Sequence, residues 1–364
     1  MRGANEEQGF IFTYLSPEQR VPQEHPLRIV KCQADAVLKG LNRTFDGMYA
    51  QTGRPSIPPE RLLKSMLLMA LYSMRSDRLF CESLDYNILF RWFLDMSLEE
   101  RSFDHSTFSK NRDRLIKHEV AREFFATVVT YARTENLLSD EHFTVDGTLI
   151  EAYASMKSFV AKGKEQVNND DDDPSNPSVD FHGEKRNNAT HASTTDPDAR
   201  LIRKGKGKEA KLSYSCNALM ENRHGLCVDV ELLKADGNAE RDAALAMLDR
   251  LIKRDIEPKT LGADKGYHAQ EFVTGLLTRC VKPHIAMIAG RKTQGLDSRT
   301  AKHKGYQVSQ RKRKLVEEIF GWIKTVGNLR KTRFRGLERV REQCLWVLSA
   351  YNLLRIGRLL ARAA

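Results

Sequence analysis

The stretch HFTVDGTLIEAY, residues 142–153, marks the point where the character of the chain changes. Its residue pattern predicts a β-strand, with Asp146 near the end of that strand. The residues before it carry the patterns of helices, whereas the residues after it mix strand and helix patterns. The stretch therefore predicts the first strand of an α/β sheet domain that follows an all-α region.

Three further elements are predicted downstream. Residues 211–233, KLSYSCNALMENRHGLCVDVELL, predict two strands joined by the turn ENRHG, which is a hairpin. Residues 260–267, TLGADKGY, predict a short strand with Asp264 at its C-terminal end. Between them, residues 238–254 predict an amphipathic helix. The apolar side of this helix consists of Ala243, Met247, Leu248 and Leu251.

Helices are predicted throughout residues 1–135, which we take as one domain, with residues 136–364 as the second. The clearest helical segments are 56–74, 81–96 and 103–120. Short helices that end in a polar, basic one resemble a helix-turn-helix, whose second helix enters the major groove of DNA. The alternative is a helical bundle with a solvated basic face. The last segment has Asp104 or Ser106 as its capping residue and carries Lys110, Arg112 and Arg114.

Residues 161–211 predict a mobile polar insertion in the sheet domain, because they are rich in polar residues and proline and poor in aromatic ones. The insertion contains four consecutive aspartates, Asp170 to Asp173. Adjacent carboxylates on a flexible loop repel one another and lack the fixed geometry that a metal ion needs. We therefore do not assign a metal site to them.

The charge of the chain points to a polyanionic partner. The chain has 364 residues and a formal net charge of +11, and its pI is near 9.3. Nucleic acid is favoured over a membrane, because no apolar run approaches the roughly 20 residues that span a bilayer. Six scattered cysteines without a CxxC spacing fit reduced thiols in a cytosolic protein.

The positive charge is concentrated near the C-terminus. Residues 301–341 contain 13 Lys and Arg and three Glu, a local charge of 13 − 3 = +10. Within them, RKLVEEIFGWIKTVGNLRKTRFRG (313–336) predicts a helix with an apolar stripe. Glu317 falls opposite the stripe, whereas Glu318 falls toward its edge. An ion pair between Arg313 and Glu317 explains one carboxylate but not Asp146 and Asp264 at the ends of two strands.

Taken together, these segments resemble a known family. VDGTLI, then GADKGY, then Arg313, Glu317 and Lys324 in an R-x3-E-x6-K spacing, are similar to the three blocks of bacterial insertion-sequence DDE transposases of the IS-four/IS-five superfamily. The resemblance continues through TDPDARLIRKGKGKEAKLSY and AYNLLR and covers nearly the whole chain. One residue departs from the pattern: Gln310 stands where many relatives carry a tyrosine.

The resemblance implies an RNase H-like fold in residues 136–364, with the insertion between its first and second strands. It implies that Asp146, Asp264 and Glu317 are catalytic and hold two Mg²⁺ ions, for which Mn²⁺ can substitute. Hard divalent cations prefer carboxylate oxygens, and a pair of them stabilises the attacking and leaving oxygens of DNA cleavage. Basic residues are expected to bind DNA phosphates, namely Lys265, Arg313, Lys324, Arg330, Lys331, Arg333 and Arg335.

The sequence thus predicts a cytoplasmic, nucleoid-associated DNA transposase. We expect it to bind the terminal inverted repeats of its element and the target DNA as a homodimer or a higher synaptic assembly. It would cleave the element ends and join the 3′ ends to the target by transesterification. Two alternatives remain: a non-catalytic DNA-binding protein derived from a transposase, and an RNase H-like nuclease without strand transfer.

Overall fold

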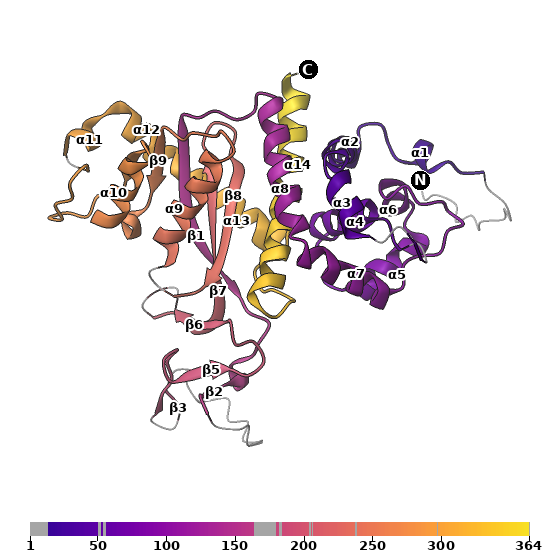
Figure 1. Cartoon of the computed structure of the whole chain (residues 1–364), viewed down its shortest axis with the longest axis horizontal. Helices are drawn as coiled ribbons and strands as arrows, with labels where there is room; N and C mark the ends of the chain where they lie inside the picture. Colours follow the sequence, from indigo (N-terminus) through magenta and orange to yellow (C-terminus); the bar gives the residue numbers. More distant parts are fainter. Residues whose placement is uncertain are drawn as a thin grey trace, which may run out of the picture.

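The structure is a computed structural model that describes residues 14–49, 52–53, 56–163, 180–181, 184–203, 205, 207–236, 239–296 and 298–363. The aspartate run 170–173 lies outside the described residues. A helical N-terminal region lies on one side of the molecule and a mixed sheet with flanking helices on the other (Figure 1). Two long helices, α8 (Val120–Thr134) and α14 (Leu337–Ala363), stand between them.

The sheet has the strand arrangement of an RNase H-like fold. Its first three long strands are antiparallel neighbours, and the next two run parallel to the first. In space these strands follow the order β10-β9-β1-β7, and β8 pairs with the far side of β7. The predicted fold class and the hairpin are thereby confirmed. The strands are β1 (His142–Glu151), β7 (Ala210–Glu221), β8 (Leu226–Lys234), β9 (Thr260–Ala263) and β10 (Lys282–Ile285).

Asp146 lies in the middle of β1 and not near its end, so that detail of the prediction is wrong. The reason is that β1 is paired unequally on its two edges. On one edge, β7 pairs with β1 from Phe143 to Glu151. On the other, β9 pairs with β1 only from His142 to Thr144. The strand therefore continues beyond the point where the parallel part of the sheet stops.

Different helices cover the two faces of the sheet. The helix α9 (Ala239–Ile252) packs on β7 and β8 from one face, and its predicted apolar side is buried. On the opposite face, α14 packs on β8, and α13 (Val316–Thr325) packs on β1 and α14. Side chains alternate between the faces along each strand. Ser215 of β7 bonds to Glu240 of α9, whereas the next residue, Cys216, lies beside Cys344 of α14, so neighbouring side chains of β7 face different helices.

The N-terminal region is helical, as predicted, but its helices are shorter than the sequence segments. Residues 81–96 form two helices because the Asn87 side chain accepts a hydrogen bond from Phe90 N at 3.0 Å and starts a new helix. Asp104, and not Ser106, caps α7. The helices are α1 (Pro17–Arg20), α2 (Pro26–Lys39), α3 (Asn42–Met48), α4 (Pro59–Leu71), α5 (Asp77–Tyr86), α6 (Ile88–Phe93) and α7 (His105–Lys117).

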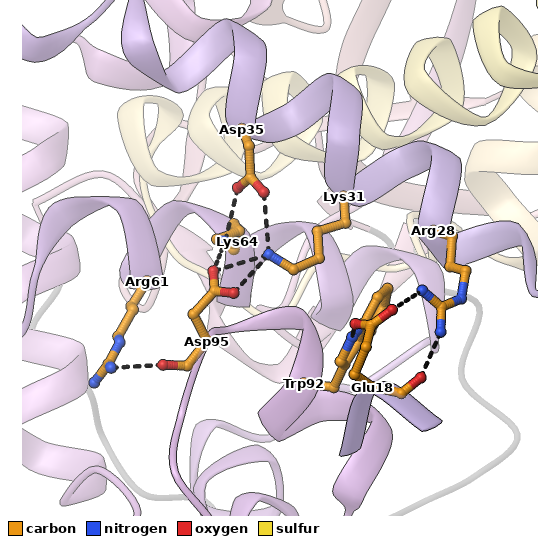
Figure 2. Close-up of polar contacts among 8 residues, drawn as sticks. All are labelled: Glu18, Arg28, Lys31, Asp35, Arg61, Lys64, Trp92 and Asp95. Carbon is orange, nitrogen blue, oxygen red and sulfur yellow. Dashed lines mark hydrogen bonds and ion pairs between the residues drawn. The ribbon is translucent and has the colours of Figure 1, made fainter. Parts of the chain in front are cut away.

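A buried lysine ties these N-terminal helices together. Lys64 in α4 is only 3% exposed, and its ammonium group contacts Asp35 at 2.7 Å and Asp95 at 2.5 Å (Figure 2). Lys31 in α2 contacts the same two carboxylates at 3.0 and 2.7 Å. A buried charge is tolerated when it is paired in this way, so the network fixes α2, α4 and the segment after α6 relative to one another.

The helical region and the sheet share one hydrophobic core through α14 and α8. The helix α14 packs against α2 and α4 as well as against α8 and β8. By length and composition α14 could cross a membrane, contrary to the expectation that no apolar run is long enough, but 67% of its apolar window is buried inside the protein. Because α8 also packs on β8, the cover of the sheet begins before the predicted boundary at residue 135.

The C-terminal part of the insertion between β1 and β7 is structured, unlike the mobile loop that was predicted. The strand β5 (His191–Ser193) pairs with β2 (Phe159–Ala161), and β6 (Arg200–Arg203) pairs with β7. Buried polar contacts hold this segment, since Ser158 Oγ and Ser193 Oγ lie 2.7 Å apart and Tyr214 donates to Asp196 at 2.6 Å. Residues 164–179 of the insertion lie outside the described part.

The connections after β9 complete the fold. A 3₁₀ turn (Lys265–Tyr267) and α10 (Gln270–Thr278) lead to β10, and two short helices, α11 (Ser298–Lys302) and α12 (Lys304–Lys312), lead to α13. All six cysteines are free in the structure.

Candidate active site

An open groove lies along the edge of β1 that β9 leaves unpaired. Among the described residues, this edge is covered by β9 as far as Thr144 and then by the Arg330–Thr332 backbone, which bonds to Glu151 at 3.1 and 2.9 Å. The groove occupies the gap between these two partners. It is lined by Asp146, Gly147, Thr148, Leu149, Ile202, Arg203, Glu240, Glu317, Phe320, Gly321, Lys324, Thr325 and Arg330.

Asp146 is a half-buried carboxylate at the centre of this gap. Burial raises the pKa of its carboxyl group above the ordinary value, and the neighbouring charge of Asp264 raises it further. The Gly147 N–H, which donates to Asp146 Oδ1 at 2.8 Å, and the charge of Arg313 act in the opposite direction. A carboxylate whose ionised form is disfavoured by burial and by a second carboxylate is a group that a cation would stabilise.

Asp264 stands beside Asp146 because of the register of the parallel strands. Thr144 is opposite Gly262, and each aspartate follows two residues later in its own chain segment. The Asp264 side chain accepts a hydrogen bond from Gly266 N at 2.8 Å. A Cβ atom at position 266 would lie 3.0 Å from Asp264 Oδ1. The glycine therefore leaves room for this turn, which holds the carboxylate at the end of β9.

The two adjacent glutamates of α13 face different surroundings. Glu317 lines the groove that also contains Asp146. Glu318 is exposed, and its carboxylate forms an ion pair with Arg355 of α14 at 3.3 Å. The helix is held by Ile319 and Ile323, which are fully buried. Glu317 therefore faces the groove, whereas Glu318 links α13 to α14.

The donor set of these three residues fits a hard divalent cation. All of them supply carboxylate oxygens, the ligands that Mg²⁺ and Mn²⁺ prefer. Within the described residues, no three acidic, histidine or cysteine side chains are close enough to hold one ion as they stand. Like charges that share a site disfavour one another's ionised form without a cation. The fold places Asp146 and Glu317 in one groove and Asp264 at the end of the neighbouring strand.

Several of the predicted basic residues surround the groove. Lys324 and Arg330 line it, and the Lys324 ammonium group donates to Thr148 Oγ1. Arg313 is half-buried and lies within electrostatic reach of Asp146. Lys265 is exposed next to Asp264. These side chains give the rim of an acidic groove a positive charge.

The segment after α13 contributes two more basic side chains near this end of β1. Lys331 is half-buried and forms an ion pair with Glu151 at 3.3 Å. Arg335 is exposed, and its guanidinium group lies 5.0 Å from the centre of the Tyr153 ring. Arg335 is therefore placed on the surface, whereas Lys331 already has a carboxylate partner.

Two predicted DNA-binding arginines point into the protein instead of toward solvent. Arg333 and Arg112 both contact the carboxylate of Asp77, at 2.9 and 2.5 Å. Their guanidinium groups lie 4.5 and 4.7 Å from the centre of the Phe334 ring. Both side chains already have a carboxylate partner inside the protein, because the 330–336 segment packs on α5 and α7, where Asp77 is available. Their predicted contact with DNA stays a prediction.

The remaining basic residues of α7 stay on the surface. Lys110 and Arg114 are exposed, and the Arg114 guanidinium group lies over the Tyr49 ring, 5.1 Å from its centre. Gln310, which departs from the family pattern, donates from its side-chain amide to the backbone oxygen of His284 in β10. It thus has a structural contact of its own.

Sequence reasoning missed one acidic residue of the groove. Glu240, the second residue of α9, lines the groove with Asp146 and Glu317. In the sequence it is an ordinary first-turn glutamate of an amphipathic helix. The one sequence signal is Gly147, directly after Asp146, because a glycine inside a strand often marks a place where another group approaches closely.

Comparison with solved structures finds transposases. The piggyBac transposase synaptic complex with hairpin DNA is 10% identical, with 93% of this chain and 76% of that chain covered and a TM-score of 0.43. The Mos1 transposase paired-end complex with the left transposon end is 12% identical, with 79% and 87% covered and a TM-score of 0.21. The Mos1 strand transfer complex is also 12% identical, with 79% and 84% covered and a TM-score of 0.22. No curated protein matches the chain.

Comparison with protein families finds two matches that follow one another along the chain. Residues 15–114 match the family described as "Transposase domain (DUF772)". Residues 179–353 match the family described as "Transposase DDE domain". Neither match is specific to the IS-four/IS-five superfamily, so that finer assignment stays a prediction. Because both matched families are transposase domains and together they span most of the sequence, the chain belongs to the DDE transposases.

Proposed function

We propose that this chain binds the terminal inverted repeats of an insertion sequence, cleaves the DNA at the element ends and joins the 3′ ends to target DNA. The observation that carries the proposal is the placement of three carboxylates at one gap in the sheet edge. Asp146 and Glu317 line the same groove, and Asp264 follows β9 at the register of Asp146.

Asp146, Asp264 and Glu317 are the residues that would hold divalent cations, Mg²⁺ or Mn²⁺. When bound, a pair of such ions about 4 Å apart supplies an activated attacking oxygen and stabilises the leaving oxygen. The chain itself orients the DNA strand. Lys324 and Arg330, on the wall of the groove, are suited to hold phosphates on either side of the scissile one.

Exposed basic residues farther from the groove would extend the DNA contact. On the catalytic side these are Lys265 and Arg335, together with the half-buried Arg313, and in α7 they are Lys110 and Arg114. Arg112 and Arg333 are left out because Asp77 already pairs with both. The α7 contact is the one that would read the terminal repeat, since a helix can enter the major groove.

The assembled state and the cellular location follow from the proposed reaction. Joining two element ends requires that both be held together, which a homodimer or a higher synaptic assembly on DNA would do. The substrate would be chromosomal DNA, so the protein would act in the cytoplasm at the nucleoid.

The adjacent glutamates provide a matched pair of variants to test the carboxylate assignment. E317Q removes a charge from the groove, and E318Q removes a charge from the Arg355 ion pair. Both variants replace a carboxylate by an amide of the same shape. We expect E317Q to abolish Mg²⁺-dependent cleavage of DNA carrying the element end while DNA binding is retained. E318Q should keep most of the activity. Equal activity of the two variants, or loss in E318Q alone, would refute the assignment of Glu317.

The same assay separates the proposed function from its alternatives. D146N and D264N should show the phenotype of E317Q, and combining two of these changes should be no worse than one. A pre-cut element end incubated with target DNA yields joined product only if strand transfer occurs. Cleavage without joined product would favour a nuclease, and binding without cleavage by the wild-type chain would favour a non-catalytic DNA-binding protein.

A further inference from the structure

Glu240 enters the groove from the opposite face of the sheet to Glu317. Its helix, α9, covers the face that carries Ser215 and Asn217 of β7. Ser215 Oγ donates to Glu240 Oε1 at 3.3 Å. Glu317 comes from α13 on the other face, and both glutamates line the same groove. They can meet there because β1 has no strand on this edge between Val145 and Ile150 in the described structure.

Gly147 is what allows Glu240 to approach β1. Gly147 lies directly opposite Asn217 in the strand pair. A Cβ atom at position 147 would lie 3.2 Å from Glu240 Oε1 and 2.8 Å from Asn217 Oδ1. Both distances are shorter than a carbon atom normally keeps from an oxygen atom, so any side chain there would push the Glu240 carboxylate away. The absence of a side chain at Gly147 thus leaves room for the Glu240 carboxylate next to Asp146.

Two buried polar atoms beside these carboxylates have no partner among the described residues. Asn217 is fully buried, and its Oδ1 accepts no hydrogen bond. Tyr267 is 2% exposed, and its hydroxyl group has no partner. The hydroxyl group lies within electrostatic reach of Glu240, Asp146 and Asp264. Leaving a buried polar group unsatisfied costs roughly 1–3 kcal/mol, so a polar ligand beside these carboxylates would stabilise both atoms.

We propose that Glu240 is a fourth carboxylate of the divalent-cation site and shares a cation with Asp146 across Gly147. This inference rests on the proposed function, because it takes the groove to be the metal site. Mg²⁺ and Mn²⁺ in such sites keep part of their water shell. Asn217 Oδ1 is placed to accept a hydrogen bond from a water molecule of that shell, and the Tyr267 hydroxyl group to donate one to a carboxylate.

The first turn of α9 supplies the control for a test of this role. Glu240 and Asp242 are both acidic residues of that turn, but Asp242 is exposed and does not line the groove. E240Q and D242N each remove one negative charge from the same helix end. A difference between the two variants therefore reports the groove position and not the net charge or the helix dipole.

The measurement is titration of the full-length chain with MnCl₂, with free Mn²⁺ followed by electron paramagnetic resonance and without DNA. E240Q should raise the Kd of at least one Mn²⁺ site by about tenfold or more, as loss of a carboxylate near a metal does. D242N should leave every Kd within about twofold. E240D keeps the charge but shortens the side chain, and it should also weaken binding if the carboxylate must reach across Gly147.

Each outcome bears on either the inference or the proposed function. If D146N loses Mn²⁺ binding while E240Q and E240D bind as the wild type does, Glu240 is not a ligand and the inference alone is overturned. If D242N weakens binding as much as E240Q does, the effect is one of general charge, and the inference is again overturned. Failure of the wild-type chain to bind Mn²⁺ would count against the proposed metal site itself.

Discussion

Replacement of Arg333 by alanine should reduce the stability of the protein and leave the salt dependence of DNA binding unchanged. The guanidinium group of Arg333 donates to Asp77 Oδ1 and to the Arg75 carbonyl oxygen, both at 2.9 Å. It also stacks on Phe334 at 4.5 Å. These contacts join the 330–336 segment of the catalytic part to α5 of the helical region, and none of them involves DNA.

The size of the loss can be worked out from these contacts. A hydrogen bond to a charged group contributes about 1.5–3 kcal/mol, and a partly desolvated cation–π contact contributes about 0.5–2 kcal/mol. The freed side-chain entropy, about 2 kcal/mol, offsets part of the loss, and Asp77 keeps Arg112 as a partner. We therefore expect R333A to lower the free energy of unfolding by about 2–3 kcal/mol. D77A should cost more, about 3–5 kcal/mol, because it leaves two buried guanidinium groups without a counterion.

R335A is the matched control, since Arg335 is two residues away and exposed. Thermal or urea unfolding followed by circular dichroism should show R333A less stable than the wild type and R335A nearly unchanged. Fluorescence anisotropy with labelled DNA at several salt concentrations should show a changed salt dependence of DNA binding for R335A and an unchanged one for R333A. R335A should lower the slope of log K against log salt by about one unit if it contacts one phosphate. A lower slope with unchanged stability in R333A would refute the internal role of Arg333.

Three further changes test the packing that supports the site. Burial raises the pKa of Glu342 to about 8. The stability that its protonated form contributes is therefore complete below about pH 4.5 and is lost as the pH rises through 8. In urea unfolding, the free energy of unfolding should fall by up to about 1.4 kcal/mol per pH unit across this range, and E342Q should remove that fall. G327A should cost about 1–3 kcal/mol, because its Cβ would clash with Val347 Cγ1 and lie 2.8 Å from the Ile323 carbonyl oxygen. N87A should cost about 1 kcal/mol by removing the cap of α6. Thermal unfolding of G327A or N87A that matches the wild type would contradict the close packing at Gly327 or the cap at Asn87, respectively.

The sequence was sufficient to predict elements whose signal is local. The fold class, the hairpin around residues 222–225, the short strand before Asp264 and the buried side of α9 are all confirmed. Each depends on a residue pattern within one segment, such as a period of two or of 3.6 residues. The candidate carboxylates Asp146, Asp264 and Glu317 were singled out by their resemblance to the three blocks of a known family, and their catalytic role stays a prediction.

Local signals also led to errors where a neighbour in space decides the outcome. Residues 81–96 carry one helical pattern, yet the Asn87 side chain caps a second helix. Asp146 looked terminal, but pairing with β7 extends β1 by five residues beyond it, to Glu151. The polar segment 187–203 looked unstructured, although its strands pair with β2 and β7 and so satisfy its backbone hydrogen bonds.

Only the tertiary structure decided which charged residues face the groove and which hold the protein together. Arg333 and Arg335 are both arginines of one basic segment, yet one is paired with Asp77, 256 positions away in the chain, and the other is exposed. Glu240 has no distinguishing sequence pattern, and it reaches the groove because β9 ends early and position 147 is glycine. A charge becomes a ligand or an ion-pair partner through the groups around it, and these come from segments whose proximity no local pattern records.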